Sequence, residues 1–253
     1  RFILSNGHGC ALLYSILHLC GYKISLQDLK SFRQLGSITP GHPEKNHTPG
    51  IEVTTGPLGQ GFANGVGMAL ASKKISSKYN KPDIELLNHN IYVMCGDGCL
   101  MEGITNEAAS LAGHLKLNNL IVLYDDNKIT IDGNTDLTFT EDVTLRFESL
   151  GWNVYEILDG DNDIKLIEET LLKAKLSDKP VLIRVKTTIG YLSNKQNSSK
   201  SHGAPLGLEE VKRLRKLFGF ENYNNFEFPK ELIEECKKIS EKGIESENKW
   251  NII

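Results

Sequence analysis

Two apolar runs of the chain each end in a short polar cluster, and this pattern limits the fold that the chain can adopt. The run 91–95 leads into Gly96-Asp97-Gly98, and the run 120–124 leads into Asp125-Asp126-Asn127. Short apolar runs alternate with segments of helical spacing, which predicts an α/β fold: a parallel sheet with helices on both faces. Ligands bind beyond the carboxyl ends of such strands, so both polar clusters are expected at the functional site.

The other elements follow from apolar spacing and turn residues. A helix expected over 58–79 begins with many small residues, including Gly59, Gly61 and Gly65, which implies close approach of another backbone or a ligand. The segment 36–57 is a long loop rich in Gly, Pro, Thr and His, and such a loop is typical of a functional region. The remaining expected helices are 9–20, 25–33, 104–115, 140–149, 163–176, 207–217 and 229–241, and the expected strands are 91–95, 120–124, 153–157 and 181–187.

Composition and charge exclude several classes of function. With 253 residues, 40 % hydrophobic residues and a net charge of −3, the chain has a globular profile and no basic patch for nucleic acid. No apolar run approaches the roughly 20 residues of a membrane span, and no signal peptide is recognisable, so no membrane partner is expected. The five cysteines form no Cys-x-x-Cys pair, which disfavours a zinc site and favours a reducing, cytoplasmic location.

Oxygen ligands for a divalent cation are available where two predicted strands end. Asp97, the amide of Asn127 and the backbone carbonyl of Ile129 are the hard donors that Mg²⁺ or Ca²⁺ prefers, with phosphate oxygens completing the shell. The Gly98 N–H would approach a phosphate at the start of the next helix. Taken alone, Gly-Asp-Gly is most simply a turn. The second polar cluster at a neighbouring strand end favours a cation that holds a diphosphate.

Two other motifs leave a structural and a functional interpretation open. The Gly-rich run 54–61 opens a helix and would cradle phosphates, yet a tight turn with a close-packed helix explains it equally well. It lacks the lysine of a P-loop and the glycine spacing of a dinucleotide fingerprint. Glu102, near the start of the predicted helix 104–115, is either a capping carboxylate or a contact across a subunit boundary.

Three of the seven histidines lie in glycine-containing turns. His8, His42 and His202 stand in Asn-Gly-His-Gly, Pro-Gly-His-Pro and Ser-His-Gly. Such turns expose an imidazole to a cleft, where it donates to phosphates or exchanges protons near neutral pH. A structural role is the alternative for each one, and their similar settings favour a shared site.

Taken together, these motifs resemble the transketolase family of thiamine diphosphate enzymes. The resemblance covers nearly the whole chain, and its residues lie in the segments 4–9, 32–37, 39–44, 48–61, 96–103, 106–114, 124–127, 131–133, 187–191 and 202–207. It implies the thiamine diphosphate-binding fold of the diphosphate-binding type. Leu192 departs from the family pattern, which usually has glycine after the Gly-Tyr pair.

The resemblance assigns cofactor roles by position. Asp97, Asn127 and the Ile129 carbonyl would bind Mg²⁺, with Ca²⁺ as the alternative cation. Ile131 would lie near the thiazolium ring. The full set of residues that would contact thiamine diphosphate is His8, Gly56, Pro57, Leu58, Gly98, Asn127, Ile131 and His202.

The resemblance also implies the chemistry. His42 and His202 would face the sugar phosphate as substrate-binding and catalytic groups that form hydrogen bonds and transfer protons, and Glu102 would lie at a dimer interface. The implied reaction moves a two-carbon ketol unit from a ketose phosphate to an aldose phosphate, as in the pentose phosphate pathway. The cofactor is the electron sink, and the protein supplies orientation and proton transfer.

By the same resemblance, residues 1–253 form a single diphosphate-binding domain that lacks its first segment, and 219–253 form a helical tail that leads to a linker. The pyrimidine-binding and C-terminal domains are absent, so this chain alone is expected to be inactive, whereas the complete protein is expected to be a homodimer. Three alternatives remain. They are a related enzyme such as deoxyxylulose-phosphate synthase or dihydroxyacetone synthase, a split transketolase subunit, and a non-catalytic binding module.

Overall fold

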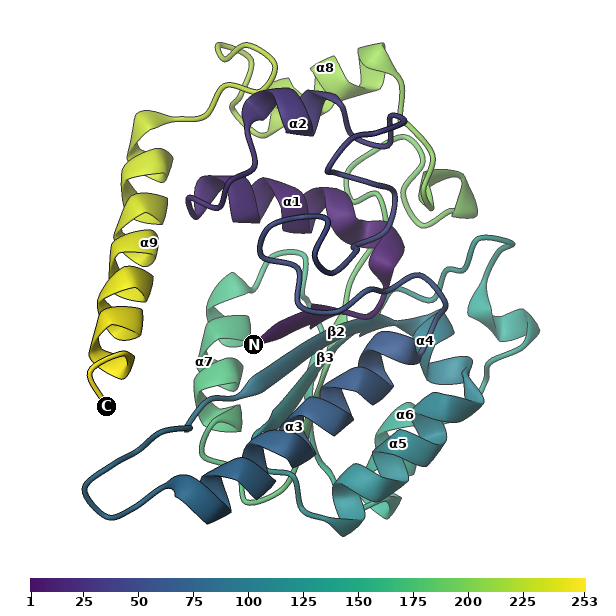
Figure 1. Cartoon of the computed structure of the whole chain (residues 1–253). Coiled ribbons are helices and arrows are strands. Elements are labelled where there is room, and N and C mark those ends of the chain that lie inside the picture. The colour runs from purple at the N-terminus through teal and green to yellow at the C-terminus, as the bar shows by residue number, and fades with distance from the viewer.

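The computed structural model describes residues 1–253 and contains one five-stranded sheet (Figure 1). Every strand pair is parallel, and the strand order is β1-β2-β3-β5-β4. The predicted parallel α/β fold is confirmed, and each predicted strand lies within two residues of its expected bounds. The strands are β1 (Phe2–Leu4), β2 (Ile91–Gly96), β3 (Leu120–Asp126), β4 (Asn153–Ile157) and β5 (Val181–Lys186).

The strand β1 is not predicted from the sequence, because three residues are too few to show an alternating pattern. In the structure Ile3 pairs with Val93 of β2, and the Ser5 N–H donates to the Met94 carbonyl at 2.8 Å. This pairing brings the residues that follow β1 to the carboxyl edge of the sheet, beside the end of β2.

Nine helices surround the sheet, and most begin and end close to their predicted bounds. The short helix α4 starts directly at Asp97 and is not predicted, while α9 continues from the predicted end at 241 to Trp250 despite Gly243. None of the helices has both the length and the apolar character needed to cross a membrane. The helices are α1 (Cys10–Leu19), α2 (Leu26–Lys30), α3 (Gln60–Tyr79), α4 (Asp97–Met101), α5 (Gly103–His114), α6 (Val143–Ser149), α7 (Ile164–Ala174), α8 (Leu208–Leu217) and α9 (Lys230–Trp250), with 3₁₀ turns at Gly7–Gly9, Thr135–Leu137 and Ser199–Ser201.

Both faces of the sheet are covered, as the sequence predicts (Figure 1). Alternate residues of β2 point to opposite sides: Val93 belongs to the core cluster formed with α3, α5 and α6, whereas Tyr92 packs with α7 and Met94 with α1. A strand buried on both sides must be apolar along its length, which is why β2 and β3 are recognisable in the sequence.

The glycines of α3 allow this helix to lie directly against the first two strands. A Cβ atom on Gly61 would lie 2.6 Å from the Ser5 Cα, and one on Gly65 would lie 2.3 Å from a methyl group of Val93. A Cβ atom on Gly67, in contrast, would meet no atom within 4 Å. The predicted close approach is therefore confirmed for Gly61 and Gly65, and it is a contact with the protein's own β1 end and β2.

Candidate functional site

A cavity of about 610 Å³ opens at the carboxyl edge of the sheet, where the polar clusters were expected. It gathers residues from segments far apart in the chain: the turn after β1, the loop before α3, and the ends of β2 and β3. The predicted residues that line it are His8, His42, Gly56, Leu58, Asp97, Gly98, Glu102, Asn127, Ile129, Ile131 and His202. Pro57 is exposed and is not part of the lining, although both of its neighbours are.

Asp97 is a carboxylate held in a buried position at the end of β2. Its side chain is 2 % exposed, its Oδ1 accepts a hydrogen bond from the Tyr124 hydroxyl at 2.6 Å, and its Oδ2 accepts one from the Lys128 N–H at 3.1 Å. Burial raises the pKa of Asp97 to about 6, despite the hydrogen bond from Tyr124. These partners orient the carboxylate without neutralising it, so its negative charge remains available to a cation.

Asn127 and Ile129 place two further oxygen atoms near Asp97. The Asn127 Oδ1 accepts the Ile129 N–H at 3.0 Å, and its Nδ2 donates to Asp125 at 3.0 Å, which fixes the amide. An amide oxygen has a second lone pair free for another partner. The Ile129 carbonyl oxygen accepts no hydrogen bond from the protein. One carboxylate, one amide oxygen and one carbonyl form a donor set that suits Mg²⁺ or Ca²⁺.

Asp125 and Asp126 are consecutive residues of β3, and they differ in their partners and in their position relative to the cavity. Asp126 is buried and forms an ion pair with Arg184 at 2.6 Å, so its charge is already balanced. Asp125 lines the cavity and accepts hydrogen bonds from Thr187 and Asn127. Burial raises the pKa of Asp125, with smaller opposing effects from these two hydrogen bonds. The cavity thus has a second carboxylate for which a nearby cation would be favourable.

The three histidines of the glycine-containing turns meet in the same cavity. The rings of His8 and His202 lie with their centroids 4.7 Å apart. Burial, and then the neighbouring His202 and His42, lower the pKa of His8, while burial lowers the pKa of His202. The Nδ1 of His202 is buried without a hydrogen-bond partner. Neighbouring imidazoles that disfavour each other's protonation would be stabilised by an anion between them.

Gly98 and Glu102 lie on the rim formed by α4. A Cβ atom on Gly98 would lie 2.7 Å from a methyl group of Leu58, so glycine lets the loop before α3 close over the start of α4. Glu102 lies between α4 and α5 and forms no capping hydrogen bond with its side chain. Its carboxylate is exposed. Glu102 is thus the N-cap residue of α5 by position but not by a side-chain hydrogen bond, and its place in a subunit contact stays a prediction.

The comparison that decides the family covers the whole chain. A family model described as the transketolase, thiamine diphosphate binding domain matches residues 1–253. The chain belongs to this family.

Known transketolases are similar to this chain in both sequence and structure. Transketolase 1 of Saccharomyces cerevisiae is 55 % identical over 253 residues, a match to 99 % of this chain and 37 % of the yeast protein. A transketolase from Leishmania mexicana has a TM-score of 0.97 at 46 % identity, over 99 % of this chain and 38 % of that one. A Pichia stipitis transketolase in complex with sedoheptulose 7-phosphate has a TM-score of 0.96 at 51 % identity, over 99 % of this chain and 37 % of that one. The chain therefore spans little more than a third of the length of these transketolases.

Two residues of the transketolase-like cavity, Asn6 and Arg33, lie in the motif segments 4–9 and 32–37 but are given no role by the sequence analysis. Arg33 reaches the cavity because the long loop folds back: a Cβ atom on Gly41 would lie 3.2 Å from the Arg33 Nε. Asn6 lines the cavity through the unpredicted pairing of β1, and its buried Oδ1 has no partner. The position of Asn6 beside His8 in one turn is the signal that could have identified it. For Arg33 the corresponding signal is its place in the motif segment 32–37.

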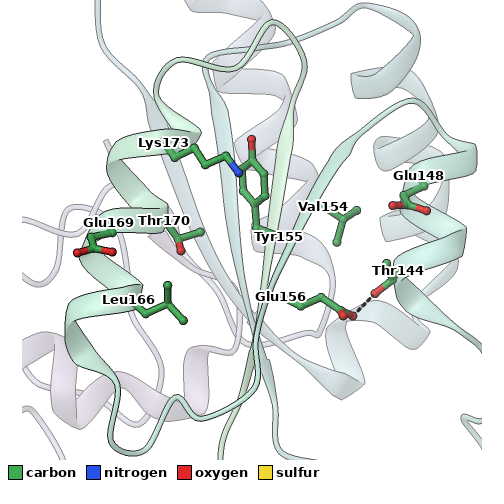
Figure 2. A pocket seen from close by; sticks show the side chains of 9 residues that line it. All are labelled: Thr144, Glu148, Val154, Tyr155, Glu156, Leu166, Glu169, Thr170 and Lys173. Atoms are coloured by element: carbon green, nitrogen blue, oxygen red, sulfur yellow. Dashed lines mark hydrogen bonds between the residues drawn. The ribbon is translucent and has the colours of Figure 1, made fainter.

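A second hollow, of about 550 Å³, lies beside the edge strand β4, between α6 and α7 (Figure 2). Two of its charged side chains, Glu156 and Lys173, have partners. Glu156 accepts hydrogen bonds from Thr144 at 2.6 Å and Arg184 at 2.8 Å, and the Lys173 ammonium lies 4.3 Å from the centroid of the Tyr155 ring. No predicted site residue lines it. This hollow therefore offers no concentration of reactive groups comparable to that at the carboxyl edge of the sheet.

Proposed function

We propose that this chain forms the diphosphate-binding half of a transketolase active site. The observation that carries the proposal is the convergence of Asp97, Asn127 and three histidines in one cavity at the carboxyl edge of the sheet. Membership of the family supports thiamine diphosphate as the ligand. In the proposed reaction a two-carbon ketol unit passes from a ketose phosphate to an aldose phosphate, a step of the pentose phosphate pathway.

Mg²⁺ would be held by Asp97, Asn127 and the carbonyl oxygen of Ile129, with Ca²⁺ as a weaker alternative. Two features of the cavity support this assignment. The pKa of Asp97 is raised to about 6 by burial, and a bound cation would stabilise the ionised form. The Ile129 carbonyl oxygen has no hydrogen-bond donor, and a cation would give this polar atom a partner.

The diphosphate would lie between this cation and the histidines. His8 and His202 would donate to its oxygens, and the Gly98 N–H would approach it at the start of α4. Gly56, Pro57, Leu58 and Ile131 would contact the remainder of thiamine diphosphate. Ile131 supports this role, because 70 % of this apolar residue is exposed at the cavity.

Proton transfer is the part of the chemistry that the chain's own side chains would perform. Thiamine diphosphate, when bound, supplies the electron sink for breaking and forming a carbon–carbon bond. His42 and His202 would bind the sugar hydroxyl groups and move protons to and from them. Burial lowers the pKa of His202, so its imidazole is largely neutral at pH 7 and has a ring nitrogen available as a proton acceptor.

The partners are part of the same proposal. Because the chain spans 37 % of its yeast relative, the pyrimidine-binding and C-terminal domains would be supplied by other parts of a longer protein. The substrates would be sugar phosphates, since a Pichia stipitis relative is a complex with sedoheptulose 7-phosphate. We further propose a homodimer with the exposed Glu102 at its interface. The five free cysteines are consistent with a cytoplasmic location.

The test is a ketose phosphate and aldose phosphate exchange assay of the full-length protein. We expect an activity that requires both thiamine diphosphate and a divalent cation, and no activity from residues 1–253 alone. His42→Ala should lower kcat at least tenfold while leaving the affinity for thiamine diphosphate within about twofold. Exchange activity that persists after complete removal of thiamine diphosphate would contradict the proposal.

A further inference from the structure

A small polar hollow lies at the amino edge of the sheet, away from the cavity of the proposed active site. Its volume is about 150 Å³, and all but one of its ten lining residues are polar or charged. It lies where β2 and β3 begin, since Asn90 and Asn119, which directly precede these strands, both line it. The Ile91 N–H donates to the Asn119 carbonyl at 2.8 Å, which holds the two strand starts together. None of its residues lines the cavity at the carboxyl edge, so the two are separate features.

The ionisable side chains of the hollow are two lysines and a histidine. Lys73 lies in the last two turns of α3, and Lys175 directly follows α7. Neither lysine forms an ion pair, and no Asp or Glu residue lines the hollow. Burial lowers the pKa of His89, the third of these groups. Because two ammonium groups line the hollow without a counter-charge, a bound anion would be favourable there.

Asn119 contributes a buried hydrogen-bond acceptor to the lining. The residue is 9 % exposed, its Nδ2 donates to the Ala69 carbonyl at 3.1 Å, and its Oδ1 has no hydrogen-bond partner. Buried polar atoms are rarely left without a partner. An anion that brings only acceptor oxygens would leave the Asn119 Oδ1 unsatisfied, whereas an anion that also carries a hydroxyl group would donate to it.

The size of the hollow limits the ligand further, because sites for drug-sized molecules occupy roughly 300–1,000 Å³. We propose that the hollow binds hydrogen phosphate, HPO₄²⁻, a small tetrahedral anion with one hydroxyl group. Its ionised oxygens would accept hydrogen bonds from the ammonium groups of Lys73 and Lys175, and its P–O–H group would donate to the Asn119 Oδ1. The proposal is independent of the proposed function, because it involves no residue of the cavity at the carboxyl edge.

The test measures how fast single lysines of the full-length protein are acetylated by N-hydroxysuccinimide acetate, across a phosphate titration at constant ionic strength. Acetylation requires the unprotonated amine, and a paired anion favours the protonated one. Tandem mass spectrometry should show the rates at Lys73 and Lys175 falling at least fivefold at saturating phosphate. Lys74, the next residue of α3, does not line the hollow and should react at an unchanged rate. Equal rates at Lys73 and Lys175 with and without phosphate would overturn the proposal.

Sulfate separates the proposed site from a general attraction of anions. It has the shape and the charge of hydrogen phosphate but carries no proton to donate to Asn119. A site built to bind a hydroxyl group rejects the analogue that lacks it, so half-protection of Lys73 should require at least tenfold more sulfate than phosphate. Protection by both anions at equal concentrations would also overturn the proposal, since the hollow would then be a nonspecific basic surface.

Two exposed lysines provide matched variants. Lys175→Gln should raise the phosphate concentration that half-protects Lys73 at least tenfold, because it removes one of the two proposed charge-assisted hydrogen bonds. Lys74→Gln removes the same charge from the surface of α3 and should leave that concentration unchanged. Asn119→Leu, with its fold checked by urea unfolding, should abolish the preference for phosphate over sulfate. Equal effects of Lys175→Gln and Lys74→Gln would contradict the assignment of the site to this hollow.

Discussion

At the scale of single residues, Asp97 is the side chain on which the proposed cation site depends most. It is buried, it is oriented by Tyr124 and the backbone of Lys128, and it forms no ion pair, whereas the equally buried Asp126 forms one with Arg184. The contrast is between two acids at the ends of neighbouring strands, Asp97 after β2 and Asp126 at the end of β3. Asp126 is paired with Arg184, and Asp97 has no ion-pair partner, which is why we propose Asp97 as the ligand of a cation.

The raised pKa of Asp97 predicts how the cation-free protein responds to pH. Its native pKa, about 6, exceeds the ordinary value of 3.8, so the native state binds more protons than the unfolded state between these two values. The free energy of unfolding should therefore fall as pH rises from 4 to 6, by up to about 1.4 kcal/mol per pH unit from this group, and level off above pH 6.

The measurement is urea unfolding of the cation-free protein at several pH values, compared with Asp97→Asn. The variant keeps the size of the side chain and removes its titration, so only the difference in slope between the two proteins is interpreted. Equal slopes for both proteins between pH 4 and 6 would show that Asp97 titrates normally.

At the scale of elements, the position of α3 depends on glycine. Gly61 lies against Ser5 at the end of β1, and the Phe62 N–H donates to the Ser5 Oγ at 3.0 Å. The segment that follows β1 contains both Ser5 and His8, so the contact with α3 also helps to position His8. Close packing of α3 on β1 is thus a structural condition for the cavity, although no residue of α3 lines it.

Gly61→Ala should therefore destabilise the protein by about 2–4 kcal/mol, because its methyl group meets backbone that cannot move aside. Gly67→Ala is the matched control in the same helix: its Cβ meets open space, and we expect a gain of up to about 1 kcal/mol. Denaturant unfolding of both variants provides the test. Similar effects from the two substitutions would mean that close packing does not explain the glycines of α3.

The elements that were predictable from sequence are those with enough residues to show a period. The strands β2 and β3 are recognisable because both of their faces are buried, and Asp97 and Asn127 follow directly from the ends of these strands. The strand β1 and the helix α4 are too short to be recognised. The places of Asn6 and Arg33 depend on long-range pairing and on a folded-back loop, which a local pattern does not contain.

At the scale of the whole molecule, the cavity at the carboxyl edge of the sheet has exposed residues in its lining. Ile131 and Glu102 are exposed at or near its rim, and the chain spans 37 % of the length of its yeast relative. An exposed apolar side chain beside a polar cavity is most simply explained by a ligand or another domain that covers it. We therefore propose that this chain binds the cation and the diphosphate, and that the remainder of the protein binds the other half of the cofactor.

The most direct test of this account is a calorimetric titration of the full-length protein with thiamine diphosphate, with and without Mg²⁺. We predict binding that requires Mg²⁺ and that weakens at least 100-fold in Asp97→Asn, whereas Glu148→Gln, in the hollow beside β4, should bind as the unmodified protein does. Thiamine diphosphate binding of unchanged affinity in Asp97→Asn would contradict the proposed role of Asp97 as a ligand of the cation.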